Sequence, residues 1–141
     1  SVTINDMVFV HGGLSETCLN LGLSLEQMNT AFQKQILDMP EEEILADPAL
    51  KILYSEVGPI WYRGYFEEGF TKKRARDILR FLGKKHIVIG HTPAPQVRGL
   101  YGSKIFAIDS SIQLGEDGEL FWYEEGKFFR GSLSGEKIKL Q

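Results

Sequence analysis

Two short apolar runs, far apart along the chain, each end at a histidine that lies next to glycine. Residues 8–13 read Val-Phe-Val-His-Gly-Gly, and residues 87–92 read Ile-Val-Ile-Gly-His-Thr. Runs of β-branched and aromatic residues favour strands, and glycine marks the places where strands end. Both runs therefore predict buried strands, with His11 and His91 at the strand ends, which is where layered α/β proteins place their ligands.

The composition is that of an ordinary globular domain. The 141 residues are 43% hydrophobic and 25% charged, with a formal net charge of -3. A charge this small does not attract nucleic acid or an anionic membrane surface, and no apolar run approaches the roughly 20 residues that cross a bilayer. We expect one unit over residues 1–141 that is soluble, with a cytoplasmic location favoured and with no nucleic-acid or membrane partner.

The chain has a single cysteine, Cys18, so it cannot form an internal disulfide bond. No histidine lies near Cys18 in sequence to activate its thiol. We therefore expect Cys18 to be a packing residue with no chemical role.

The first half of the chain is expected to combine a hairpin with several helices. Residues 1–10 predict a β-hairpin with its turn at Asn5 and Asp6. Ser24 and Gln27 have the spacing of a capping box, and the apolar residues after them keep a helical period to about residue 39. Three further segments are expected here: short helices over 40–45 and 49–55, and an ordered aromatic loop over 60–70.

The second half is expected to begin with a helix and end with strands. Thr71 can cap a helix over 72–82, and Gly83 is well placed for its left-handed end. Glycine-rich and acidic segments separate the apolar runs that follow, with one turn predicted at residues 115–118. Strands are expected over 87–89, 104–108, 119–123, 127–130 and 137–140.

The best candidates for chemistry are His11, His91 and Arg63. Two neutral imidazoles that share one edge of a sheet could ligate zinc, manganese or iron, whereas a lone strand-end histidine is usually a hydrogen-bonded or surface residue. Arg63 lies in the aromatic loop, where its guanidinium could hold a phosphate by two hydrogen bonds. The alternative for Arg63 is a structural cation stacked on Trp61 or Tyr65.

The two histidine motifs resemble the last two signatures of the calcineurin-like metallophosphoesterases, especially the bacterial and Shewanella-like branch of the phosphoprotein phosphatases. The resemblance extends through residues 58–65 and the segment 105–109. The earlier signatures of that family, an Asp-x-His, a Gly-Asp-x-x-Asp-Arg-Gly and a Gly-Asn-His-Glu, do not occur in the chain. The resemblance therefore implies that residues 1–141 are the carboxy-terminal portion of such a domain.

Several expectations follow from this resemblance. The fold would be α+β, part of a four-layer α-β-β-α sandwich. The activity would be hydrolysis of phosphate monoesters, on phosphoserine, phosphothreonine or phosphotyrosine proteins, at a centre of two divalent metal ions (manganese, iron or zinc). His11 and His91 would be metal ligands and Arg63 a catalytic residue. The partners would be a phosphorylated protein or small phosphoester and a missing amino-terminal half, without which the chain would be inactive.

Two other functions remain open from the sequence. A dinucleoside polyphosphate hydrolase would use residues 60–70 to stack a base. A non-catalytic module would keep half of the fold for binding alone.

Overall fold

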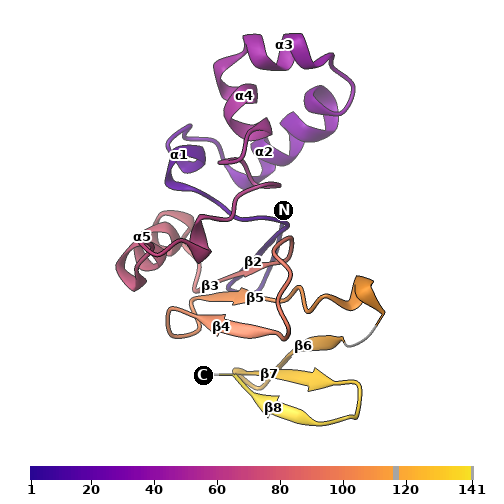
Figure 1. Ribbon diagram of the computed structural model, residues 1–141. Helices are drawn as coiled ribbons and strands as arrows, with labels where there is room; N and C mark the ends of the chain where they lie inside the picture. Colours follow the sequence, from indigo (N-terminus) through magenta and orange to yellow (C-terminus); the bar gives the residue numbers. More distant parts are fainter. Residues whose placement is uncertain (116–117, 141) are drawn as a thin grey trace.

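A five-stranded mixed sheet lies at the centre of the computed structural model, which describes residues 1–115 and 118–140 (Figure 1). Its order is β1-β2-β3-β5-β4. The three inner strands are parallel, and the edge strands β1 and β4 pair antiparallel with them. The strands are β1 (Val2–Ile4), β2 (Met7–Val10), β3 (His86–Ile89), β4 (Arg98–Leu100) and β5 (Ile105–Ala107).

The predicted hairpin is confirmed. Strands β1 and β2 pair with Ile4 opposite Met7, and Asn5 in the turn has φ 53°. Asparagine is one of the few residues that adopts this left-handed conformation at little cost. The hairpin places β2 beside β3, with Val10 level with Ile89, so the residues after both strands emerge at one edge of the sheet.

Alternation along the inner strands gives the sheet two apolar faces. Because successive side chains point to opposite sides, Val8, Ile87 and Ile105 pack in one core with the helices. Met7, Val88 and Phe106 form a second core on the other face. This pattern explains why the inner strands read as continuous apolar runs rather than as alternating ones.

Five α-helices contribute residues to the first core. They lie above and beside the sheet in Figure 1. Capping explains where most of them begin: Ser24 forms the predicted capping box with Gln27, and the Asp47 carboxylate accepts hydrogen bonds from two backbone N–H groups. The helices are α1 (Glu16–Leu19), α2 (Leu25–Ala31), α3 (Glu41–Ala46), α4 (Pro48–Tyr54) and α5 (Lys72–Leu82).

Helix α5 has the boundaries that the sequence predicts. The Thr71 hydroxyl accepts a hydrogen bond from the Arg74 backbone N–H, and Gly83 has φ 62° at the other end. Ala75, Ile78 and Leu79 face the first core. Helix α2 ends earlier than expected, because a π-helical turn over Phe32–Ile36 follows it.

A three-stranded antiparallel sheet covers the second face of the central sheet (Figure 1). Phe121 and Phe128 from this sheet pack on Phe106, with ring centroids 4.8 and 4.4 Å away. Its strands are β6 (Glu119–Glu124), β7 (Lys127–Ser132) and β8 (Lys137–Lys139). Three layers result: helices, the five-stranded sheet and the three-stranded sheet.

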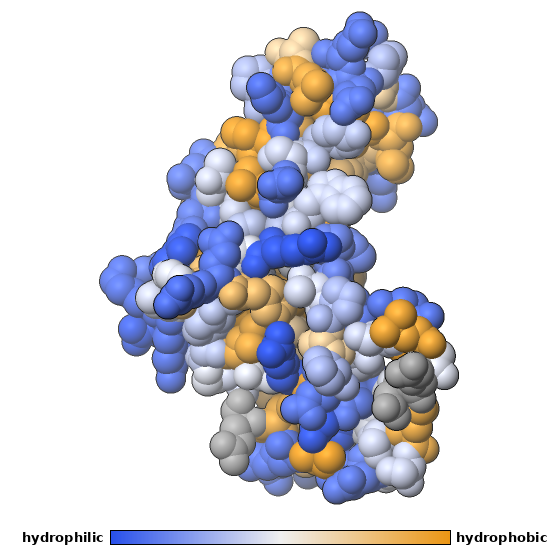
Figure 2. Space-filling view, viewed as in Figure 1, coloured by the Kyte–Doolittle hydropathy of each residue, from blue (hydrophilic) through white to orange (hydrophobic). Residues whose placement is uncertain are grey.

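The predicted four-layer α-β-β-α sandwich is wrong for the described residues. All five α-helices precede β6 in the chain, so no α-helix of the described segments follows the three-stranded sheet to form an outer layer. Figure 2 shows hydrophobic residues left on the surface over this sheet and over the helices at the top. The central sheet is mixed, and its parallel strands place the fold closer to the α/β class.

Two elements are absent from the sequence-based prediction. Helix α1 is a single turn, and β4 includes glycine and an exposed arginine, so neither carries a periodic apolar signal. Part of the turn expected at residues 115–118 lies outside the described residues. None of the helices in residues 1–115 and 118–140 is long and apolar enough to cross a membrane.

Tyr65 links the aromatic loop to the turn after β2, and its removal gives a first prediction. Its hydroxyl, in a side chain only 1% exposed, accepts from the Leu14 N–H at 2.8 Å and donates to the Leu14 carbonyl at 2.9 Å. Tyr65→Phe should lower the free energy of unfolding by about 1–3 kcal/mol, because both groups of Leu14 lose a buried partner. Urea denaturation measures this, and Tyr123→Phe is the control, since Tyr123 is 44% exposed. Equal effects of the two substitutions would contradict the prediction.

Candidate functional site

The structure brings His11 and His91 together at the edge of the sheet where β2 and β3 end. His11 Nε2 lies 2.9 Å from His91 Nδ1, and the ring centroids are 4.7 Å apart. The Gly90 N–H donates to the His11 carbonyl at 2.9 Å, which extends the pairing of the two strands by one residue. The N–H of one imidazole therefore donates a hydrogen bond to a ring nitrogen of the other, which couples the two rings.

His91 adopts a backbone conformation that is uncommon for a residue with a side chain. Its φ is 62°, in the left-handed region that non-glycine residues rarely enter and that concentrates at functional sites. Its Nε2 is buried without a hydrogen-bond partner among the described residues. A strained backbone and an unpartnered ring nitrogen at the same residue indicate that His91 is positioned to contact a ligand rather than to stabilise the fold.

The glycines after His11 are required by close packing. A Cβ on Gly12 would lie 2.3 Å from the Ile60 carbonyl oxygen, and one on Gly13 would lie 2.6 Å from the Tyr65 ring. Without side chains, both glycines can donate N–H hydrogen bonds to the Pro59 carbonyl, at 2.8 and 3.2 Å. The aromatic loop is thereby held directly against the turn that carries His11.

Arg63 and His91 line one cavity of about 710 Å³, which we call the Arg63 cavity. Arg63 is exposed and makes no ion pair with a described residue. The cation–π contacts in the described segments involve Arg74, Arg98 and Lys137. Nothing in these segments thus supports the structural alternative for Arg63, and its guanidinium is available to an anion. The cavity is lined by Tyr54, Ser55, Glu56, Val57, Trp61, Tyr62, Arg63, Gly64, Glu67 and His91.

The surroundings of His91 favour its neutral form. Burial lowers the pKa of His91, and the positive charges of Arg63 and His11 lower it further, whereas Asp109 acts in the opposite direction. Asp109 itself closes a turn in which its carboxylate accepts the Ser111 N–H at 3.0 Å, as expected of an Asx turn. A neutral imidazole can accept or donate a proton at physiological pH.

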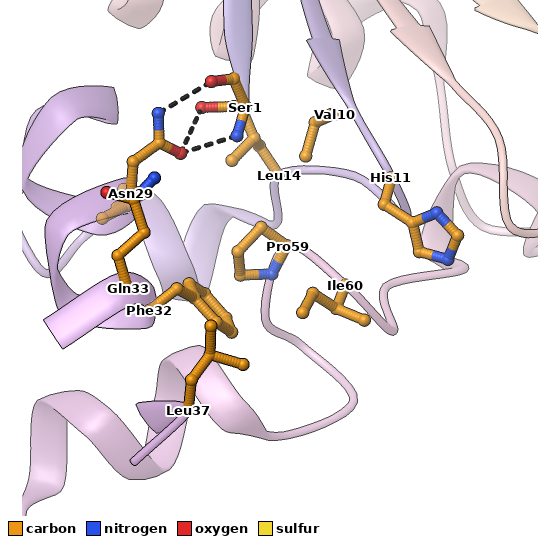
Figure 3. A pocket seen from close by; sticks show the side chains of 11 residues that line it. Ser1, Val10, His11, Leu14, Asn29, Phe32, Gln33, Leu37, Pro59 and Ile60 are labelled. Carbon is orange, nitrogen blue, oxygen red and sulfur yellow. Dashed lines mark hydrogen bonds between the residues drawn. The ribbon is translucent and has the colours of Figure 1, made fainter. Parts of the chain in front are cut away.

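A second cavity, of about 340 Å³, is lined in part by His11 (Figure 3). Val10, Leu14, Phe32, Pro59 and Ile60 give it mainly apolar walls, and His11 stands at its edge. The Ser1 amino group and the Asn29 side chain are hydrogen-bonded at 2.6 Å near its opposite end. Its described lining contains no lysine or arginine, and the Ser1 amino group is already hydrogen-bonded to Asn29, so the Arg63 cavity is the better site for an anion.

The predicted centre of two metal ions is wrong for the described residues. No group of three or more histidine, cysteine, aspartate or glutamate side chains in residues 1–115 and 118–140 is arranged to hold a metal ion. His11 and His91 are two imidazoles hydrogen-bonded to one another, and a resident metal site needs more ligands than these.

Cys18 is excluded as a nucleophile, as the sequence predicts. Its side chain is fully buried, and burial raises the pKa of its thiol to about 11. The thiolate is the reactive form, so Cys18 is inert at neutral pH. Its sulfur packs 3.9 Å from that of Met28.

The fold and the geometry together define a class of site. Parallel strands of an open sheet deliver a histidine pair at their carboxyl ends, where such sheets bind ligands. The guanidinium of Arg63, which makes no ion pair with any described residue, stands in the cavity that His91 also lines. The arrangement can hold an oxyanion and exchange a proton with it or with water, which are the requirements for hydrolysis of a phosphate ester.

Comparison with protein-family models and with characterised proteins finds no match. Three solved structures are similar to the chain, each with 38% identity and a TM-score of 0.93 over 97% of the chain. Two are titled as cold-active protein-tyrosine phosphatases, one of them from a psychrophilic Shewanella species, and the third is a point mutant of such an enzyme. The chain spans only 40–41% of the length of these proteins.

These titles correct the family inferred from the sequence. All three name a protein-tyrosine phosphatase, and none names a calcineurin-like metallophosphoesterase. The calcineurin-like family and the dinuclear metal centre that it implied are therefore wrong for this chain.

Sequence reasoning missed Trp61 as a site residue. Its indole ring lies edge-on to His91, with centroids 5.4 Å apart, and it lines the Arg63 cavity. The sequence analysis named Trp61 only as a possible support for Arg63 and, within residues 60–70, as part of a loop that could stack a base. The signal that could have identified it is its position two residues before Arg63.

His86 lies at the opposite end of β3 from the site and is half-buried. Its ring packs against Phe106 and Phe128, and Nδ1 lies 2.7 Å from the Ser103 carbonyl oxygen. Burial, followed by the charges of Lys104 and Lys85, lowers the pKa of His86 below its ordinary 6.5, against the opposing effects of the Ser103 hydrogen bond and Asp6.

The lowered pKa of His86 predicts a loss of stability in weak acid. Below about pH 6.5 the unfolded chain binds a proton at this position that the folded chain resists, so the free energy of unfolding falls as the pH drops from 6.5 toward the lowered pKa and levels off below it. His86→Leu should reduce the dependence of the unfolding free energy on pH between pH 7 and pH 5. Part of this dependence should remain, because the pKa of His91 is also lowered. Urea denaturation across this range measures the slope. Identical slopes in both proteins would be contrary to expectation.

Proposed function

We propose that the chain carries the phosphate-binding and proton-transfer residues of a protein phosphatase that hydrolyses phosphate monoesters. The observation that supports this most is the convergence of His11 and His91 beside the exposed guanidinium of Arg63. The similarity to cold-active protein-tyrosine phosphatases over 97% of the chain points in the same direction.

In this proposal Arg63 binds two non-bridging oxygens of the phosphate and stabilises the charge that develops on them. A water molecule attacks phosphorus, and the bond from phosphorus to the ester oxygen breaks. The imidazole pair accepts the proton from water and returns one to the departing alcohol, so the products are inorganic phosphate and a free hydroxyl group. Water is the nucleophile in this proposal because Cys18, the single cysteine of residues 1–141, is buried and protonated.

The proposed substrate is phosphotyrosine in a protein. This rests on the titles of the similar structures and on the aromatic lining of the Arg63 cavity by Tyr54, Trp61 and Tyr62. Phosphoserine and phosphothreonine proteins remain within the same reaction class, and the relative rates on the three kinds of peptide decide among them.

The test is phosphate release from a phosphotyrosine peptide and from p-nitrophenyl phosphate by the protein that carries this chain. We expect hydrolysis of both esters, and a loss of about 100-fold or more in His91→Ala. His86→Leu is the matched control, because His86 lies at the other end of the same strand, and it should retain activity. Failure of the unmodified protein to release phosphate from either ester would refute the proposal.

A dinucleoside polyphosphate hydrolase is the second candidate, since the exposed Trp61 could stack on a base. Glu56 and Glu67 also line the cavity, and their negative charge opposes a polyphosphate chain more strongly than a phosphate monoester, because the chain carries more negative charge. Hydrolysis of a dinucleotide without hydrolysis of the peptide would establish this candidate. Phosphate binding without hydrolysis of any ester would indicate a non-catalytic module.

A further inference from the structure

Trp61 is a large apolar residue left at the surface of the proposed site. Its side chain is 51% exposed and belongs to neither core, although tryptophan is on average a well-buried residue. Its nearest aromatic neighbour is the ring of His91, 5.4 Å away and nearly perpendicular at 78°. The remaining indole surface is open to whatever occupies the Arg63 cavity.

The backbone that carries Trp61 is fixed on both sides. Before it, the Pro59 carbonyl accepts the N–H groups of Gly12 and Gly13. After it, Tyr62 is buried and its N–H donates to the Gly58 carbonyl at 3.1 Å. The indole is therefore presented by a rigid segment, and a contact with it costs little conformational entropy.

We infer that Trp61 binds the phenyl ring of an aryl phosphate whose phosphate group lies between Arg63 and His91, and that it thereby selects phosphotyrosine over phosphoserine. The inference rests on the proposed function and adds the residue that recognises the aromatic ring of the substrate. Aromatic rings attract one another at centroid distances of 4.5–7 Å, the range in which Trp61 already meets His91. A phosphoserine side chain has no ring to place there.

Kinetics of three variants test the inference. Trp61→Ala should lower kcat/KM on a phosphotyrosine peptide about 5-fold, the size of one aromatic contact, and change it less than 2-fold on the matching phosphoserine peptide. Trp61→Phe should restore most of the loss. Trp122→Ala is the control, because Trp122 is similarly exposed, at 45%, but lies on β6. Equal losses on the two peptides, or no loss, would overturn the inference while leaving the proposed function intact.

Fluorescence provides a measurement that does not depend on turnover. Residues 1–141 contain two tryptophans, so Trp122→Phe leaves Trp61 as the single indole of this segment, and the same protein with Trp61→Phe added gives the background emission. Phenyl phosphate should change the emission of Trp61 with a dissociation constant below that of inorganic phosphate, and Arg63→Ala should weaken binding of both. An emission that stays constant at saturating phenyl phosphate would overturn the role of Trp61. Absence of binding by either compound would count against the proposed function as well.

Discussion

Replacing Arg63 by alanine is expected to lower kcat/KM on a phosphotyrosine peptide by about 100- to 1,000-fold, the usual effect of removing one preorganised donor from a developing oxyanion. Arg63 makes no ion pair with a described residue and lines the same cavity as His91. The substitution therefore removes a positive charge from the site and should change the stability of the fold little. Steady-state kinetics at fixed pH, with the melting temperature measured on the same sample, provide the test.

Two further variants make the result specific to the guanidinium at this position. Arg63→Lys keeps the charge but cannot form two parallel hydrogen bonds, so it should recover only part of the rate. Arg76→Ala removes an exposed arginine from helix α5 and should change the rate less than 2-fold. A full rate in Arg63→Ala, or an equal loss in Arg76→Ala, would remove Arg63 from the site.

Substituting alanine for Gly12 is expected to lower the free energy of unfolding by about 3 kcal/mol or more, since overpacking against backbone cannot be relieved by a side-chain rotation. The new Cβ would lie 2.3 Å from the Ile60 carbonyl oxygen and 2.9 Å from the Tyr62 nitrogen. Displacing these residues would also move Trp61 and Arg63, so activity should fall in molecules that remain folded. Urea denaturation and phosphate release measure the two effects.

Gly90 offers a matched control on the neighbouring strand end. A Cβ there would meet only the His11 carbonyl oxygen, at 3.8 Å, an ordinary contact. Gly90→Ala should leave the free energy of unfolding unchanged or raise it by up to about 1 kcal/mol, through the reduced freedom of the unfolded chain. Similar losses in both variants would show that the close contact at Gly12 is not the cause.

Local signals in the sequence predicted most of the elements correctly. Caps at Ser24, Asp47 and Thr71 mark helix starts because a side-chain oxygen can replace the missing intrahelical acceptor within a few residues. Likewise, the Asn5 turn and the apolar runs in β2 and β3 depend only on neighbours in sequence. Such features can be read from a single chain.

The sequence-based predictions failed where the structure depends on contacts between residues far apart in the chain. The hydrophobic periodicity of a segment shows whether it is a helix or a strand, but not which layers pack on one another. The four-layer prediction was therefore taken from the family resemblance, not from the residues. The approach of His11 to His91 was expected because each histidine follows a buried strand, but the role proposed for Trp61 depends on how Gly12 packs against the Ile60 backbone. That contact joins residues 48 positions apart and leaves no trace in local sequence.

The two-faced central sheet has a consequence for anyone who wishes to shorten the chain. Phe106 is completely shielded, and Phe121 and Phe128 provide much of that shielding. Ending the polypeptide before β6 would leave the aromatic underside of the strands bare, in contact with water and with other copies of itself. Strands β6, β7 and β8 thus cover the apolar face of the sheet whose strands position both histidines. They do so from the side of the sheet opposite the helices.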